Sequence, residues 1–353
     1  MRRPDPEQLD SDLEWLEAPG HHLLTHDDPR YPDLLRESAS PPAALFAVGN
    51  PDLAWQPQVA IVGSRNPTGG GVRNARAFAT ELAERGFAVT SGLAEGIDAT
   101  AHAAALDAGG ATIAVTATGP DRLYPQRNRA LAERIAEHGL LVTEFPPGTS
   151  PRRAHFPSRN RIIAALSLGT LVVEASVRSG ALITARQAGE QGRAVFALPG
   201  SIHNPLARGC HRLIRDGARL VETADDIVED LAPMAGRLAS ALRRQLDDAP
   251  ARTNEQVSGG SEPTRPGPNN RHQNNRGQEA ESPRLDPRES EPHVAADPEY
   301  ERLWSSLGFD PAPVDRLVQQ TGLTVQAVSS MLLMLELRGK VEAHPGGAYS
   351  RKT

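Results

Sequence analysis

Short apolar runs alternate with helix-forming segments along residues 58–231, and this alternation restricts the fold more than any other feature of the chain. Each run resembles a strand, ends in a turn and is followed by a helical stretch. Strands are expected at about 59–62, 87–90, 112–116, 140–142, 170–173, 194–198 and 219–221, with helices at 72–85, 97–108, 127–137, 181–191, 210–216 and 224–231. Strands that alternate with helices specify a parallel sheet covered on both faces. We therefore predict an α/β fold with a doubly wound, mostly parallel sheet.

Four of these strands end in a turn that places a small or hydroxyl residue beside glycine, just before a helix. The four turns are Gly63-Ser64, Ser91-Gly92, Thr118-Gly119 and Ser179-Gly180. In a doubly wound sheet these ends share one edge, so backbone N–H groups and helix N-termini point at one crevice. A single glycine turn is usually only a turn, but several converging turns favour an anion as the occupant.

An arginine-rich stretch lies between the strands expected at 140–142 and 170–173. Residues 145–173 contain no Asp or Glu. Guanidinium groups present planar forks that suit phosphate, so we predict a polyanion site on this connection at the sheet edge; a solvated basic loop is the alternative. For the Phe156 ring, two roles stay open: it stacks on a base of the ligand, or it is buried beside the sheet. The cationic and aromatic residues of this stretch are Arg152, Arg153, His155, Phe156, Arg159 and Arg161.

Two familiar phosphate motifs are missing. The chain has no G-x-x-x-x-G-K-[ST], which disfavours a P-loop ATPase. The first turn is GSRNPTGGG rather than G-x-G-x-x-G, and no acid is placed to hold a ribose, which disfavours a nicotinamide oxidoreductase. The net charge is −6, so any nucleic-acid site has to be a local patch on a mildly acidic molecule.

Asp98 and His102 stand four positions apart near the start of an expected helix and therefore share a face. Asp98 suits the helix dipole, and His102 is placed to hydrogen-bond to it. A structural role and an acid–base role are both open, and we favour the structural one because no serine or cysteine nucleophile is spaced to match.

The composition changes from residue 247 to 298. This stretch has eight prolines, one leucine, two valines and no Phe, Trp or Tyr, so it cannot bury enough apolar surface to fold. Order returns at Glu299 with three helical patterns and a short hairpin around 344–347, which suggests a winged helix. Its third helix has no basic residue before Arg338 and only Gln326 near its start, so we favour a protein-contact or weak DNA role.

We expect four segments: a lead-in of edge or capping structure at 1–56, the sheet domain at 57–246, a disordered linker at 247–298 and the winged helix at 299–353. Cys210 is the single cysteine, which excludes an internal disulfide or a Cys-based zinc site. No apolar run approaches the length of a membrane span, and the first ten residues lack a signal-peptide core. We expect a cytoplasmic protein without metal or cofactor.

Several ordered blocks resemble the DNA-processing protein A family, also called Smf, over about residues 22 to 231. The blocks are VAIVGSRNPT, TSGLAEGIDATAHAAAL, DRLYPQRN, EFPPGT, FPSRNRIIAALS, VVEASVRSGALITARQAGEQGRAVFALPG and RLIRDGA. The terminal module is similar to the winged-helix domain that many members carry. Two departures matter: too few residues precede the sheet to hold the complete helical domain with which members often begin, and the third turn, TATGPDR, is poor in glycine.

The resemblance implies an extended Rossmann-like domain that binds single-stranded DNA, usually as a homodimer, protects incoming strands in natural transformation and helps to load the recombinase RecA. It implies no catalysis. Carried over to this chain, the binding residues are Ser64, Arg65, Arg159, Asn160, Arg161, Ser179 and Gly180, and the pattern of strand-end turns and aromatic rings adds Ser91, Gly92 and Phe156.

Two other functions stay open. The first is a nucleotide-processing enzyme of the phosphoribohydrolase type, although the hallmark PGGxGTxxE is absent and the corresponding turn is EASVRSGALITA. The second is a transcriptional regulator that uses the terminal module.

Overall fold

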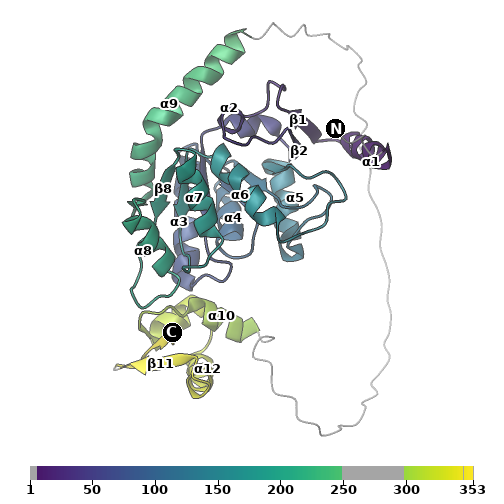
Figure 1. The fold of residues 1–353 in the computed structure, drawn as a ribbon. Helices are drawn as coiled ribbons and strands as arrows, with labels where there is room; N and C mark the ends of the chain where they lie inside the picture. Colours follow the sequence, from purple (N-terminus) through teal and green to yellow (C-terminus); the bar gives the residue numbers. More distant parts are fainter. Residues whose placement is uncertain (1–5, 249–297, 345, 353) are drawn as a thin grey trace, which may run out of the picture.

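The computed structural model describes residues 6–248, 298–344 and 346–352 of the chain. Figure 1 shows a large α/β domain, a long helix that leads away from it and a small C-terminal domain below it. Nearly all of the linker expected at 247–298 lies outside the described residues.

A nine-stranded sheet forms the centre of the large domain. Its order is β1-β2-β6-β5-β4-β3-β7-β8-β9. The seven strands from β6 to β9 in this order run parallel, whereas β1 and β2 are antiparallel additions at one edge. The predicted doubly wound, mostly parallel sheet is confirmed. The strands are β1 (His21–Thr25), β2 (Ala44–Gly49), β3 (Gln58–Val62), β4 (Ala88–Ser91), β5 (Thr112–Val115), β6 (Leu140–Thr143), β7 (Gly169–Val172), β8 (Ala194–Ala197) and β9 (Arg219–Leu220).

Helices cover both faces of this sheet. One face packs against α2, α6, α7 and α8, and the other packs against α3, α4, α5 and α9. Strands β3 to β7 are buried along their whole length, as expected for parallel strands with helices on both sides. The helices are α1 (Pro6–Leu16), α2 (Asp33–Arg36), α3 (Gly69–Glu84), α4 (Ile97–Asp107), α5 (Arg129–His138), α6 (His155–Leu166), α7 (Ala181–Glu190), α8 (Arg208–Arg215) and α9 (Ala224–Asp248), with short 3-10 helices η1 (Pro51–Trp55) and η2 (Gln126–Asn128).

The chain reverses its direction across the sheet between β3 and β7. The strands that follow β3 are added on one side, as β4, β5 and β6, and the later strands are added on the other side, from β7. Helix α3 follows β3 onto one face, while α7 follows β7 onto the opposite face. Such a switch point opens a crevice at the carboxyl ends of the two strands, which is where open α/β sheets bind their ligands.

Two local expectations were wrong. The connection that carries the arginine-rich stretch contains a helix, α6, where we expected none. Its Pro157 lies in the first turn, where proline is tolerated because that N–H has no intrahelical partner, and Ile162, Ile163 and Leu166 then bury one side against the sheet. The helix expected at 224–231 continues as α9 to Asp248.

The C-terminal domain is built from three helices and a small sheet. Its helices are α10 (Pro298–Ser306), α11 (Val314–Thr321) and α12 (Val325–Leu337), and its strands are β10 (Ala312–Pro313), β11 (Val341–His344) and β12 (Ala348–Arg351) in the order β10-β12-β11. Thr324 caps α12, since its hydroxyl accepts a hydrogen bond from the N–H of Ala327 at 3.2 Å. The domain has its own core around Leu303, Leu317 and Leu332. This is the arrangement of a winged helix.

Along the parts of the chain that the structure describes, no helix is both long and apolar enough to cross a membrane.

Candidate anion-binding site at the switch point

A pocket of about 800 Å³ opens at the carboxyl ends of β3 and β7, where the sheet reverses its order. We call it the switch-point pocket. The turn after β3, the turn before α7 and the first half of α6 supply most of its lining. Of the residues expected from sequence to bind DNA, the pocket brings together Ser64, Arg65, Phe156, Arg159, Asn160, Ser179 and Gly180.

A buried carboxylate holds the turn that follows β3. Glu174 is 7% exposed, and its two oxygens accept hydrogen bonds from the backbone N–H of Thr68 at 2.9 Å and from its hydroxyl at 2.7 Å. Asn204 donates a third hydrogen bond to Glu174 at 3.1 Å. Thr68 in turn caps α3 by accepting from the N–H of Gly71 at 3.0 Å. The end of the turn from residue 63 to 68 is therefore fixed at Thr68, and Ser64, Arg65 and Asn66 line the pocket.

Arg65 is the free cation of this turn. Its side chain is exposed, and no ion pair is found for it among the described residues. The guanidinium lies 5.6 Å from the centre of the Phe156 ring, and Tyr124 meets the same ring edge-to-face at 5.8 Å. Phe156 is only partly buried, so the interpretation of a ring buried beside the sheet was wrong. An open aromatic ring beside an unpaired guanidinium suits a nucleobase joined to a phosphate.

Arg159 is a structural residue of the pocket floor and not an exposed phosphate ligand. It is 5% exposed, and one nitrogen of its guanidinium donates to the backbone carbonyls of Gly92 and Val115 at 2.5 and 2.6 Å. Burial lowers the pKa of Arg159 to about 10, and the nearby carboxylate of Asp98 opposes this shift. Asn160 supports the same group by accepting from Arg159 Nε at 3.1 Å. Arg159 and Asn160 together hold the carboxyl ends of β4 and β5 at the floor of the pocket.

Arg161 lies outside the pocket. It forms an ion pair with Glu144 and donates to the carbonyl of Ser40. Residues two positions apart on a helix point to nearly opposite sides, so Arg159 and Arg161 of α6 do not share a face. The structure therefore does not bring Arg161 to the site expected for it.

Asp98 and His102 do not pair with each other. Asp98 accepts from the N–H groups of Gly92 and Ala94 at 3.1 and 3.4 Å, and burial raises the pKa of its carboxyl group. His102 is fully buried, and its Nδ1 lies 2.7 Å from the Thr112 hydroxyl, which itself donates to a backbone carbonyl. Burial lowers the pKa of His102 to about 3, so the ring is neutral. Both side chains have a structural role, which is the interpretation that we favoured from the sequence.

The turn after β4 contributes less than expected. Ser91 is fully buried and donates to the carbonyl of Ile61 at 2.6 Å, so its hydroxyl does not face the pocket. Gly92 lines a small side pocket of about 140 Å³ next to Arg65 and Tyr124. A Cβ atom at Gly92 would overlap the Arg159 guanidinium, so glycine is needed there for close approach. The turn at 118–119 does not line the pocket.

Arg153 and Tyr124 line the pocket although the sequence did not lead us to expect them among the binding residues. Arg153 adds an exposed cation to the mouth of the switch-point pocket. Tyr124 reaches it from the turn that precedes η2. Arg153 lies in the arginine-rich stretch and Tyr124 in the block DRLYPQRN, so both signals were present, but no pattern in the sequence says that these two side chains meet.

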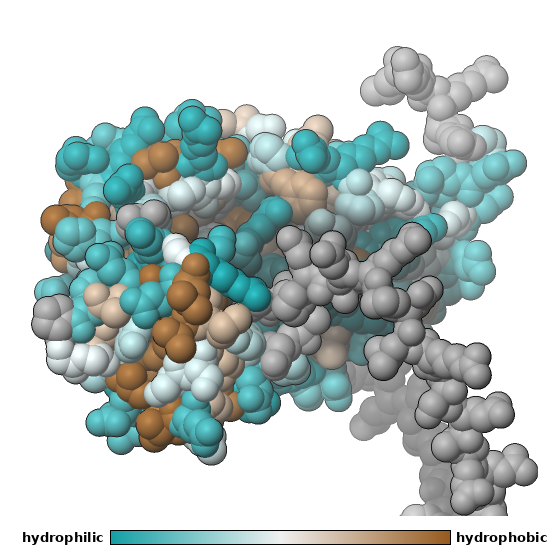
Figure 2. Space-filling model, turned by 90° about the horizontal axis from the view of Figure 1, so that it is seen from below, coloured by the Kyte–Doolittle hydropathy of each residue, from teal (hydrophilic) through white to brown (hydrophobic). Residues whose placement is uncertain are grey.

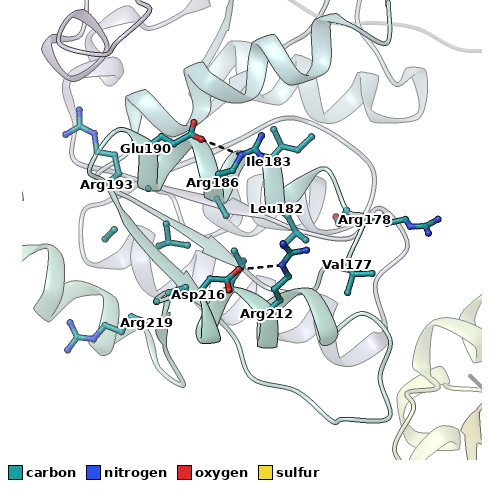
Figure 3. Close-up of a pocket in the computed structure, with 18 of the residues that line it drawn as sticks. Val177, Arg178, Leu182, Ile183, Arg186, Glu190, Arg193, Arg212, Asp216 and Arg219 are labelled. Atoms are coloured by element: carbon teal, nitrogen blue, oxygen red, sulfur yellow. Dashed lines mark ion pairs between the residues drawn. The ribbon is translucent and has the colours of Figure 1, made fainter.

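A second groove of about 910 Å³ runs between α7 and α8 over the edge strands (Figure 3). Most of its charges are internally paired: Arg186 lies 3.6 Å from Glu190, and Arg212 lies 3.5 Å from Asp216. The switch-point pocket has Asp98 as its single acidic lining residue, and that carboxylate is occupied by backbone N–H groups. Of the two, the switch-point pocket is the better anion site. The described residues contain no group of His, Cys, Asp and Glu placed to hold a metal ion.

The fold defines a Rossmann-like α/β protein with an arginine-lined pocket at its switch point and a winged helix at its C-terminus. The family model described as DNA recombination-mediator protein A matches residues 22–232, and the model described as DprA winged helix domain matches residues 287–347. The chain therefore belongs to the DNA recombination-mediator protein A family, as its sequence blocks predicted.

Relatives in several bacteria support this membership. Protein Smf of Escherichia coli K12 is 39% identical over 340 residues, which cover 96% of this chain and 80% of that protein. The DNA processing protein DprA of Streptococcus pneumoniae R6 is 47% identical over 217 residues, which cover 62% of this chain and 76% of that protein.

Two solved structures resemble the chain. DNA processing protein A from Streptococcus pneumoniae superposes with a TM-score of 0.60 at 42% identity, over 64% of this chain and 78% of that one. A structure that gives insight into the single-stranded DNA binding mode of DNA processing protein A from Helicobacter pylori has a TM-score of 0.53 at 30% identity, over 57% of this chain and 93% of that one.

Proposed function

We propose that the protein binds single-stranded DNA in the switch-point pocket and so takes part in DNA processing during natural transformation and recombination. The observation that carries the proposal is the exposed, unpaired guanidinium of Arg65 beside the open ring of Phe156, at the edge where parallel sheets bind ligands. The single-stranded DNA binding described for the Helicobacter pylori protein supports it.

The pocket binds the DNA strand through the sugar–phosphate backbone of the DNA. Arg65 and Arg153 attract phosphates, and the N–H group of Gly180 at the start of α7 offers a further donor, whereas that of Ser179 donates to the Ser176 carbonyl. Phe156 stacks on a base, which is tolerant of sequence because every base has a flat face. Binding of this kind weakens steeply with salt and has little sequence preference.

We further propose that the protein acts by binding rather than by catalysis. Asp98 is the carboxylate of the pocket, and its hydrogen bonds to Gly92 and Ala94 leave it fixed as a structural acceptor. Glu174 behind the turn is likewise occupied by Thr68 and Asn204. Neither is positioned as a general base, which argues against the phosphoribohydrolase alternative. Protection of incoming strands, loading of RecA, a homodimer and a cytoplasmic location belong to the same proposal.

The test is single-strand binding by Arg65→Ala across a salt series, compared with duplex of the same sequence. We expect the affinity to fall about tenfold and the slope of log K against log salt to become shallower by about 0.7, because one phosphate contact is lost. Arg134→Ala is the matched control, since Arg134 is an exposed arginine of α5 that pairs with Asp107 at 2.8 Å, away from the pocket. If Arg65→Ala kept both the wild-type affinity and the wild-type slope, the strand would bind elsewhere.

A further inference from the structure

Three successive glycines, Gly69, Gly70 and Gly71, form the first turn of α3, and each has a different environment. A Cβ atom at Gly71 would stand 2.5 Å from a carboxylate oxygen of Glu174. One at Gly70 would meet nothing closer than 3.4 Å, which is ordinary contact. One at Gly69 would overlap the backbone carbonyl oxygen of Ser305, which belongs to the winged helix. The winged helix therefore packs on this turn so closely that Gly69 has no room for a methyl group.

Arg351 supports α10, the helix that makes this contact, from within the winged helix. Arg351, at the end of β12, is 9% exposed, and its guanidinium stacks 4.4 Å above the Trp304 ring and donates to the Trp304 carbonyl. Burial lowers the pKa of Arg351 to about 10, and the carboxylate that opposes this shift is Glu174 of the large domain. The positive charge of Arg351 thus interacts across the domains with Glu174, the carboxylate that holds Thr68.

The docked winged helix leaves the pocket open. All residues that line the switch-point pocket belong to the large domain. The contact runs through α10, and Figure 1 shows the winged helix against the lower end of the large domain with α12 turned away from it. The domain is therefore placed to support the turn that carries Arg65 without blocking a ligand.

We propose that the winged helix of this chain docks through α10, which Arg351 holds from behind, on the first turn of α3 and there braces the turn from residue 63 to 68. The glycine at position 69 is the feature that permits the contact, and Glu174 links it to the pocket. The bracing effect on strand affinity rests on the proposed function, whereas the dock itself does not.

Single-molecule energy transfer on the full chain tests the dock. Labels go on Arg129→Cys in α5 and Arg338→Cys after α12, both exposed, because the native Cys210 is buried and burial raises the pKa of its thiol to about 12. We expect one dominant transfer efficiency for the wild type and for Gly70→Ala, and a broad, lower distribution for Gly69→Ala. Alanine favours a helix over glycine at either position, so neither variant should fail to fold.

A narrow, wild-type distribution for Gly69→Ala would overturn the dock, as would a broad distribution for the wild type. If the dominant efficiency appeared only at high protein concentration, the docked winged helix would come from a second copy, and the assignment to the same chain would be wrong.

The same variants test the bracing. Gly69→Ala should bind single strands about threefold more weakly than Gly70→Ala, with an unchanged salt slope. A substitution in a packed contact that couples two sites typically changes the affinity by about this factor. Undocking with unchanged affinity would overturn the bracing alone. A wild type that binds no single strands would defeat the proposed function and leave the energy-transfer result standing.

Discussion

Open α/β sheets bind their ligands at a switch point, and winged helices commonly read DNA with their third helix, yet the surfaces that this chain presents at these two places differ. The pocket presents Arg65 and Arg153 beside the Phe156 ring. The exposed side of α12 instead carries Val325, Leu333 and Leu337, which are 55%, 55% and 74% exposed. Figure 2 views the molecule from the end where the winged helix lies, and brown side chains gather there among teal ones.

The comparison teaches that a winged-helix fold does not by itself supply the side chains of a DNA-reading helix. A reading helix needs Arg, Lys, Asn or Gln near its start, and α12 offers Gln326 alone. Its apolar side is better suited to protein than to the charged backbone of a duplex. In this chain, the charge and the donors needed for DNA are concentrated in the α/β domain.

The largest effect, on stability, is expected for Arg159→Met. This variant tests whether Arg159 supports the fold, in contrast to Arg65, which is free to bind a ligand. Removing the guanidinium leaves the carbonyls of Gly92 and Val115 and the carboxylate of Asp98 without their cation. We expect a loss of about 3–5 kcal/mol in the free energy of unfolding, as for other broken buried charges. Urea denaturation measures it. A variant as stable as the wild type would show that Arg159 is free to bind ligand after all.

An intermediate effect is expected for Phe156→Ala. Loss of the ring should weaken single-strand binding by about 1–3 kcal/mol, because a stacked base contributes that much, and should leave the salt slope unchanged. Phe156→Tyr is the matched control, since it keeps an aromatic face over which Arg65 and Tyr124 can pack. If the alanine and tyrosine variants bound single strands with equal affinity, stacking on Phe156 would not contribute to binding, and phosphate contacts alone would explain it.

The smallest effect is expected for Gln326→Ala on α12. Gln326 is exposed, and a surface substitution of this kind changes binding or stability by no more than about 0.5 kcal/mol. Single-strand and duplex affinities of the full chain should both stay at the wild-type level. A clear loss of duplex binding would break the comparison, because it would make α12 a DNA-reading helix despite its apolar side.

The sequence determined the architecture and the edge of the sheet at which the candidate site lies. Alternating strands and helices required a parallel sheet, and glycine-containing turns at successive strand ends required a crevice at its carboxyl edge. Only the tertiary structure decided which residues face that crevice. Arg159 and Arg161 look alike in an acid-free stretch, but α6 turns the first under the pocket and the second toward Glu144.

The same limit applies to contacts between distant segments. Nothing in GSRNPTGGG says that Gly71 meets Glu174 or that Gly69 meets Ser305, because the partners are about 100 and more than 200 residues away along the chain. Local sequence patterns predict whether a residue belongs to a strand, a turn or a helix. The packing of those elements on one another decides whether a guanidinium supports the fold or stays free for a ligand.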